Sequence, residues 1–321
     1  MQKLHLGAAQ CALDLGDGSE RAEYVNQDYI LHKLGRPHRA IGIMYTYYPH
    51  DKQWPQRISK ACKDMNITFQ WDYPYDDYFP FNADGQPWEQ MRDIRRHGQD
   101  AALTLTLDCS LSDDELREVA RMLRPYGRMT IRINHECSGT WFTHNKRFTY
   151  EQVGKFFAHF SDIIHQEAPN VRTVFCAGFA QADGKLEKED EFAVAYRAAD
   201  VWSADCYLAL HYGWPYDVAE VGGGQYKADS VGMYYDLFRR TYERASSQFG
   251  AKPLVTAEFN TDGDVTGPRH QGESVIRFAE AFRDHQADWF KAISLYQFRD
   301  RGRLGLEIED PNNPAVGIEQ P

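Results

Sequence analysis

Short β-rich runs alternate with longer amphipathic segments along the whole chain, and this alternation limits the fold more than any other feature. Such a pattern is typical of βα units arranged around a parallel sheet. Eight runs have strand character: residues 4–9, 40–48, 67–73, 128–134, 171–178, 201–208, 253–259 and 292–298. Because 321 residues suit one α/β barrel, we predict a (β/α)8 TIM barrel with a single catalytic domain over residues 1–321.

Amphipathic segments fill the gaps between these runs. The clearest, SDDELREVARMLRPYG, predicts a helix capped by Ser112 with Glu115 at the third helical position. A ninth extended run, AALTLTLD at residues 101–108, disturbs the count of eight strands. We interpret its residues 101–107 as an extra strand or an extended loop after the third strand. Loops rich in glycine, proline and aromatics follow several runs, on the side that carries active sites in such barrels.

Composition narrows the functional classes. The net charge is −11, which argues against a nucleic-acid partner because phosphate binding needs clustered Lys and Arg. No stretch of 18 apolar residues suggests a membrane span. The six cysteines lack paired or metal-ligand spacing, so we expect free thiols. The first ten residues do not resemble a secretion signal, so we expect either a cytoplasmic protein or one whose leader has been removed.

Two glutamates lie at the carboxyl ends of predicted strands. Glu136 follows RMTIRINH and Glu258 follows PLVTA, 122 positions apart, or about 41 for each of three βα units. A charged residue there is functional or paired in a salt bridge. Two carboxylates over one barrel mouth suit glycosidic bond cleavage, and a separation of about 5 to 5.5 Å would predict retention of anomeric configuration.

The remaining polar and aromatic residues fit a sugar site. Sugar rings stack on aromatic faces, so we expect at least two platforms among the aromatic residues at or just after strand ends: Trp71, Trp141, Trp214 and Tyr207. Arg132, inside the fourth strand, must be paired, with Asp72 or Asp205 as candidate partners, or else contact substrate. The chain has no common zinc motif, phosphate loop or serine-hydrolase elbow, so we expect no cofactor and no metal.

The chain resembles clan A glycoside hydrolases, whose acid/base ends strand four and whose nucleophile ends strand seven. RINHECSGTWF resembles the Arg-x-x-His-Glu-x-x-Gly-x-Trp-Phe signature of glycoside hydrolase family 26, best known for endo-β-1,4-mannanases. Shorter stretches are similar too: ITFQWDYP to the family's third strand, RHGQD to its segment before the acid/base, ADCY to its strand six and VTAEFN to its nucleophile strand.

The resemblance implies roles residue by residue. Glu136 matches the acid/base and Glu258 the nucleophile. His135 matches a histidine that approaches the sugar hydroxyls, a role that Asn134 could share. Tyr207 matches a tyrosine that donates to the nucleophile. An acid needs a raised pKa, which an apolar wall of Trp141 and Phe142 would provide by desolvation.

Two departures from the family pattern affect the expected substrate more than the expected hydrolysis. Thr143 and His144 follow Trp-Phe, where the family usually continues with another tryptophan. On strand eight, SLYQFRD leaves Tyr296 or Phe298 where many clan members have a tryptophan. The expected substrate-binding residues are His135, Asn134, Tyr207, Trp141, Trp71, Asp205, Arg132, Trp214 and Tyr296.

We therefore expect a retaining β-glycoside hydrolase acting on a poly- or oligosaccharide. An endo-β-1,4-mannanase-like activity is the first hypothesis, with β-xylan or β-glucan as alternative substrates. A barrel that binds carbohydrate without cleaving it, and an unrelated barrel lyase or isomerase, are the alternatives from other classes.

Overall fold

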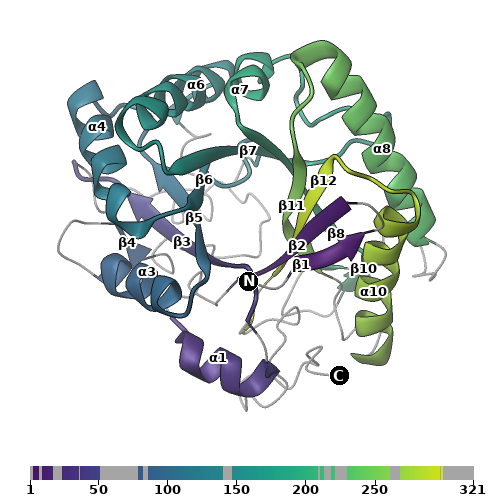
Figure 1. The fold of residues 1–321 in the computed structure, drawn as a ribbon. Helices are drawn as coiled ribbons and strands as arrows, with labels where there is room; N and C mark the ends of the chain where they lie inside the picture. The colour runs from purple at the N-terminus through teal and green to yellow at the C-terminus, as the bar shows by residue number, and fades with distance from the viewer. Residues whose placement is uncertain are drawn as a thin grey trace.

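The computed structural model describes most of the chain. The described residues are 3–6, 9–16, 24–35, 37–50, 79–81, 86–139, 147–208, 210–212, 218–220, 230–260, 268–296 and 298. Within them the chain forms a barrel of parallel strands surrounded by helices (Figure 1).

Eight parallel strands close the barrel. In chain order they are β2 (Ala9–Gly16), β3 (Ala40–Tyr47), β5 (Asp100–Leu107), β6 (Met129–Ile133), β7 (Val171–Phe179), β8 (Val201–Tyr207), β11 (Leu254–Asn260) and β12 (Phe290–Leu295). Each pairs in parallel with the next, and β12 pairs with β2. The predicted (β/α)8 fold is confirmed.

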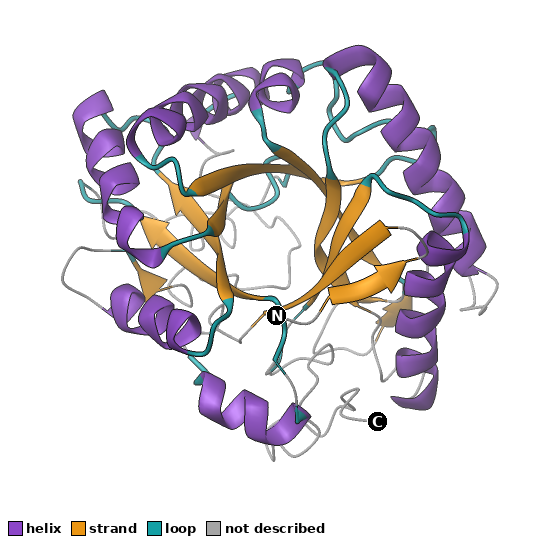
Figure 2. Ribbon diagram, viewed as in Figure 1, coloured by secondary structure: helices purple, strands orange, loops and turns teal. Residues whose placement is uncertain are grey.

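A helix lies between each strand of the barrel and the next, on the outside of the sheet (Figure 2). In chain order these are α1 (Gln27–Leu34), α3 (Gln86–Arg96), α4 (Asp113–Met122), α6 (Tyr150–Glu167), α7 (Ala193–Ala198), α8 (Ser230–Phe249) and α10 (Pro268–Asp284), with the 3-10 helix η3 (Arg124–Tyr126) after α4. None of the described helices is long and apolar enough to cross a membrane.

Among the described residues, four short strands lie outside the barrel ring. β1 (Lys3–Leu6) pairs antiparallel with β2, and β4 (Phe79–Pro80) pairs with β3. β9 (Leu210–Tyr212) and β10 (Val218–Glu220) form an antiparallel pair after β8.

The predicted cap of α4 is present. The Ser112 side chain accepts the backbone N–H of Glu115, and the Glu115 side chain accepts the backbone N–H of Ser112. These two bonds satisfy N–H groups that the first helical turn leaves without partners, which explains why the helix begins there. Gly127, at φ 67°, then turns the chain into β6.

Two strand predictions need correction. The run from Leu4 contributes β1, and the first barrel strand is β2. The third barrel strand is β5, where the sequence predicts an extra strand or an extended loop. The run from Ile67, expected to be third, lies outside the described residues, but β5 pairs directly with both β3 and β6 and fills that place. An apolar run of this length is ambiguous on periodicity alone.

The reason β5 suits the barrel is its two different faces. Leu103, Leu105 and Leu107 are fully buried and belong to the main hydrophobic core. Thr104 lies on the opposite face of the strand, where its hydroxyl accepts a hydrogen bond from Arg132. A parallel strand buried on both faces requires such a sequence, with few charges and little exposed surface.

Candidate active site

Glu136 and Glu258 meet at the carboxyl ends of the barrel strands. Glu258 lies in β11, and Glu136 lies three residues beyond the end of β6. Both side chains are buried, with Glu136 8% and Glu258 5% exposed. One carboxylate oxygen of each, together with a ring nitrogen of His135, lies within 4.8 Å of the others. The two carboxylates therefore share one small volume.

The backbone after β6 takes an unusual course that brings these groups together. Asn134 has φ 61° and Glu136 has φ 37°. Asparagine adopts this left-handed conformation readily, but for glutamate it costs about 1–3 kcal/mol, and such strain clusters at functional sites. The next residues bond to β7: Cys137 N donates to Cys176 O at 3.1 Å, and Ser138 N donates to Ala177 O at 2.8 Å.

A bulge in β11 directs Glu258 into the same space. The pairing of β11 with β8 shifts register between Val255 and Phe259. Side chains of β8 satisfy the N–H groups freed there: Ser203 Oγ accepts from Ala257 N at 2.9 Å, and Asp205 Oδ1 accepts from Glu258 N at 3.0 Å. Bulges commonly redirect a side chain beside an active site.

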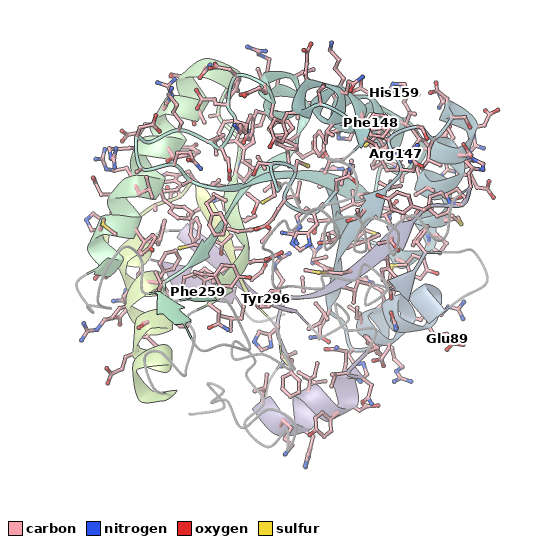
Figure 3. The ribbon with its side chains drawn as sticks, turned by 180° about the vertical axis from the view of Figure 1, so that it is seen from behind. Glu89, Arg147, Phe148, His159, Phe259 and Tyr296 are labelled. Carbon is pink, nitrogen blue, oxygen red and sulfur yellow. The ribbon has the colours of Figure 1, made fainter. Side chains whose placement is uncertain are left out.

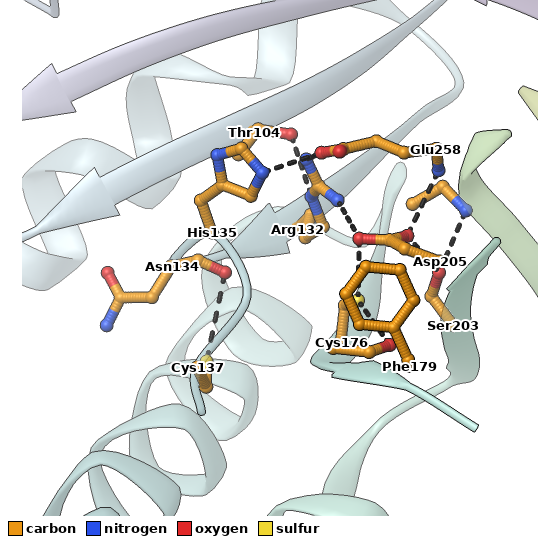
Figure 4. Close-up of polar contacts among 12 residues, drawn as sticks. Thr104, Arg132, Asn134, His135, Cys137, Cys176, Phe179, Ser203, Asp205 and Glu258 are labelled. Atoms are coloured by element: carbon orange, nitrogen blue, oxygen red, sulfur yellow. Dashed lines mark hydrogen bonds and ion pairs between the residues drawn. The ribbon is translucent and has the colours of Figure 1, made fainter. Parts of the chain in front are cut away.

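Three side chains contact the Glu258 carboxylate. Arg132 Nη2 lies 2.5 Å and His135 Nε2 lies 2.6 Å from Oε1. Tyr207 Oη donates to Oε2 at 2.9 Å. Figure 4 shows the Arg132 and His135 contacts converging on Glu258. Both oxygens are thus fixed, and the carboxylate is held in one orientation.

Asp205 lies within the same network and contacts Arg132. Arg132 Nη1 lies 3.3 Å from Asp205 Oδ2, and Arg132 Nε donates to Thr104 Oγ1 at 3.0 Å. The Cys176 thiol donates to Asp205 Oδ2 at 3.4 Å. The expected pairing of Arg132 with Asp205 is present, and Glu258 is its second partner. Asp72, the other candidate, lies outside the described residues.

The surroundings shift the ionisation of the two glutamates in opposite directions. Burial raises the pKa of Glu136 well above its ordinary value, and the negative charges of Glu258 and Asp205 add to this rise. Burial alone would raise the pKa of Glu258 as well, but contact with His135 and Arg132 lowers it by more, so it lies below the ordinary value. The site therefore favours the protonated form of Glu136 and the anionic form of Glu258.

Burial also shifts the pKa values of the groups around the two glutamates. Burial raises the pKa of Tyr207 well above its usual range, and the neighbouring Glu258 adds to the rise. Burial and the charge of Glu258 raise the pKa of Asp205 to about 7. Burial lowers the pKa of His135, and the adjacent Glu258 carboxylate opposes this shift.

Asn134 is held by contacts within the chain. Its side-chain Oδ1 accepts from Leu107 N at 2.8 Å, and its Nδ2 donates to Cys109 Sγ at 3.5 Å. Its own N–H donates to Leu105 O. These contacts join the end of β6 to the end of β5 and stabilise the turn that carries Glu136.

Tyr296 lies beside the site at the end of the eighth barrel strand (Figure 3). Its ring contacts that of Tyr207 edge-on, with centroids 5.8 Å apart. Its carbonyl accepts from Asn260 Nδ2 at 2.6 Å, which ties β11 to the residue after β12. The expected platforms Trp71, Trp141 and Trp214 lie outside the described residues, as do Phe142 and His144.

Several residues of the site escaped sequence reasoning. In the sequence Thr104, Cys176 and Ser203 resemble ordinary strand residues. Only their alternating positions, on the inward face of their strands, indicated that they have polar partners. Phe179 ends VRTVFCAGF and resembles a core residue, yet it is 38% exposed.

His135, Glu136 and Glu258 could supply one metal ligand atom each. Two observations disfavour a cation there. Arg132 already places a positive charge against Glu258, and burial favours the protonated form of Glu136. These three side chains are therefore better suited to a pair formed by a protonated acid and an anion than to a metal site.

No protein-family model matches the sequence, and no curated protein sequence matches it. Solved structures do match. An exo-β-1,4-mannosidase from Opitutaceae bacterium strain TAV5 aligns with a TM-score of 0.54 and 11% identity, over 97% of this chain and 57% of that one. A family 39 glycoside hydrolase from Bacteroides cellulosilyticus WH2 has a TM-score of 0.54 and 10% identity, over 92% and 59%.

A GH113 β-1,4-mannanase aligns over 99% of this chain and 95% of its own length, with a TM-score of 0.52 and 10% identity. The chain spans less than two thirds of the mannosidase and of the family 39 enzyme. At this identity the similarity shows a shared barrel fold.

Proposed function

We propose that this protein is a retaining β-glycoside hydrolase in which Glu136 is the acid/base and Glu258 is the nucleophile. The observation that carries the proposal is the pair of carboxylates with one oxygen of each within 4.8 Å of the other, whose surroundings push their pKa values apart. Carboxyl groups about 5–5.5 Å apart are typical of retaining enzymes, whereas inverting enzymes need about 6.5–9.5 Å to admit a water. The observed closeness favours the retaining mechanism.

The reaction would proceed in two displacements. In the first, a Glu258 oxygen bonds to the anomeric carbon while Glu136 gives its proton to the departing glycosidic oxygen. In the second, Glu136, now anionic, takes a proton from water as that water attacks the same carbon and releases Glu258. The burial of Glu136 keeps it protonated for the first step, and the donors around Glu258 keep the nucleophile anionic.

The remaining site residues divide into two proposed groups. Tyr207 donates to Glu258 and is partly exposed, so we place it where a sugar hydroxyl would approach. His135 contacts Glu258 but is as buried as Arg132, so its sugar contact stays a prediction. Arg132 and Asp205 are almost fully buried, so we assign them to positioning Glu258. Stacking by Trp71, Trp141, Trp214 and Tyr296 stays a prediction, as does a substrate contact of Asn134.

A β-1,4-mannan is the first substrate to test. The family 26 resemblance of the strand-four motif supports it, and fold similarity to a β-1,4-mannanase and an exo-β-1,4-mannosidase is compatible with it. β-Xylan and β-glucan are the alternatives. A barrel that only binds carbohydrate is the competing function, and the intact carboxylate pair argues against it.

The test incubates the protein with mannan, xylan, laminarin and barley glucan and measures new reducing ends. We expect one polymer to be cut, and we expect Glu258→Ala to abolish cutting, with azide restoring turnover of an activated glycoside. A binding protein would retain a polymer without releasing reducing ends. Undiminished turnover by Glu258→Ala would reject the assignment of the nucleophile.

A further inference from the structure

Phe179 presents an exposed aromatic ring at the carboxyl end of the barrel. It is the last residue of β7 and is 38% exposed, although the strand residues before it, from 173 to 178, are buried. Its ring lies against Tyr207, with centroids 6.4 Å apart and an angle of 57° between the planes. Tyr207 in turn donates to Glu258. The exposed ring is therefore one residue removed from the proposed nucleophile.

The backbone holds this ring in place by specific contacts. The pairing of β7 with β8 shifts register between Cys176 and Phe179, which are paired with Ser203 and Asp205. At this bulge the Phe179 N–H bonds to a side chain: it donates to Glu187 Oε2 at 2.8 Å. Bulges beside active sites commonly redirect one side chain.

Gly178 makes this contact possible. It has φ 153°, and a Cβ built on it would lie 2.2 Å from Glu187 Oε2. Only a residue without a side chain lets the carboxylate come so close. The Tyr196 hydroxyl fixes the other end of Glu187 by donating to its carbonyl at 2.7 Å. Three residues thus hold the Phe179 backbone at the barrel mouth.

Exposing an aromatic ring costs free energy unless a ligand covers it. Burying a Phe side chain is favourable, and Phe179 forgoes part of this gain in the free protein. Sugar faces with axial hydrogens cover such rings in carbohydrate sites. Of the polar groups that could orient a sugar, Tyr207 lies directly beside the ring and Glu258 lies behind Tyr207.

We propose that Phe179 is the platform of a second sugar subsite, which binds the sugar unit on the leaving-group side of the cleaved bond. This rests on the proposed function. The sugar that Glu258 attacks lies over Glu258, so the leaving sugar lies on the side of Glu136, which protonates it. Phe179 ends β7, the direct neighbour of β6, and the turn that carries Glu136 is bonded to the end of β7 by Ser138 N, which donates to Ala177 O at 2.8 Å.

The test compares two substrates that form the same covalent intermediate. One is β-1,4-mannotetraose, whose leaving group is a sugar; the other is β-mannobiosyl fluoride, whose leaving group is too small to stack. If the polymer panel shows a xylan or glucan enzyme, the corresponding oligosaccharide and fluoride replace them. We expect Phe179→Ala to lower kcat/KM on the oligosaccharide roughly tenfold or more and to change it less than about twofold on the fluoride.

Matched variants separate recognition from folding. Phe179→Leu keeps an apolar side chain without a flat face and should lose the same preference, whereas Phe179→Trp should retain it. Ile276→Ala removes another exposed apolar side chain, 57% exposed on α10, and should change neither rate. Thermal unfolding of each variant checks that the barrel is intact.

Equal loss on both substrates, or no loss on either by Phe179→Ala and Phe179→Leu, would overturn the proposed subsite while leaving hydrolysis in place. A wild-type protein that cleaves neither substrate class would instead contradict the proposed function. The two failures are therefore distinguishable.

Discussion

Arg132 in β6 and Glu258 in β11 are 126 positions apart in the chain and form a buried ion pair, with Nη2 2.5 Å from Oε1. Arg132 also contacts Asp205, so one guanidinium serves two carboxylates. A guanidinium offers five donors in a fixed plane, which suits this bridging position better than a lysine. The pair joins the fourth and seventh barrel strands directly beneath the proposed reaction.

Arg132→Leu should destabilise the protein strongly. Removing one partner of a buried ion pair typically costs about 3–5 kcal/mol, because the remaining charge is left without compensation. Here both Glu258 and Asp205 would lose their cationic partner. The free energy of unfolding in urea measures it, with Arg132→Lys as the control that keeps a charge. A loss below about 1 kcal/mol would contradict the network described here.

Tyr207→Phe should slow the reaction without unfolding the barrel. The hydroxyl donates to the Glu258 carboxylate at 2.9 Å. A hydrogen bond to a charged group is worth about 1.5–3 kcal/mol, so kcat should fall by about 10- to 100-fold. The same loss should move the acid limb of the pH profile to higher pH, since the anion has one donor fewer. A reduced kcat with an unmoved acid limb would contradict this role of Tyr207.

The pH profile should report both glutamates. Hydrolysis requires Glu258 ionised and Glu136 protonated. Because the pKa of Glu258 is lowered and that of Glu136 is raised, kcat/KM should fall on the acid side below the ordinary glutamate range and on the alkaline side well above it. The two limbs belong to the coupled pair.

A glycosyl fluoride separates the two limbs. Fluoride leaves without a proton, so the alkaline limb should disappear for this substrate while the acid limb remains. Glu136→Gln should likewise remove the alkaline limb. It should still release one equivalent of fluoride as the glycosyl-enzyme forms, but hydrolyse that intermediate slowly, because the base of the second step is missing. An alkaline limb that is unchanged in Glu136→Gln would assign the proton to another group.

Asn134→Ala should act mainly on stability. The substitution leaves the buried Leu107 N–H without its acceptor, which costs about 1–3 kcal/mol, and it places alanine at φ 61°. The free energy of unfolding measures the effect. Asn134→Asp keeps an acceptor for Leu107 N and should recover part of the loss. If Asn134→Ala instead raises KM with unchanged stability, the residue contacts substrate.

The sequence predicted that Glu136 follows the fourth barrel strand and that Glu258 lies at the carboxyl end of the seventh. It could do so because the runs before these glutamates are continuous and largely apolar. It misplaced the third strand because the runs from Ile67 and Ala101 have the same character, and only pairing with β3 and β6 distinguishes them. Contacts such as Cys176 with Asp205 depend on the closure of the barrel, which no local pattern records. Phe179 was missed because exposure arises from a bulge rather than from the residue itself.

Labelling with an activated 2-fluoro-glycoside tests the central claim most directly. Such a reagent forms the glycosyl-enzyme intermediate quickly and releases it slowly. Peptide mass spectrometry should then find one sugar attached to Glu258, in wild type and not in Glu258→Ala. A sugar attached to a different residue, or inactivation without any attached sugar, would contradict the assignment of Glu258 as the nucleophile of a retaining enzyme.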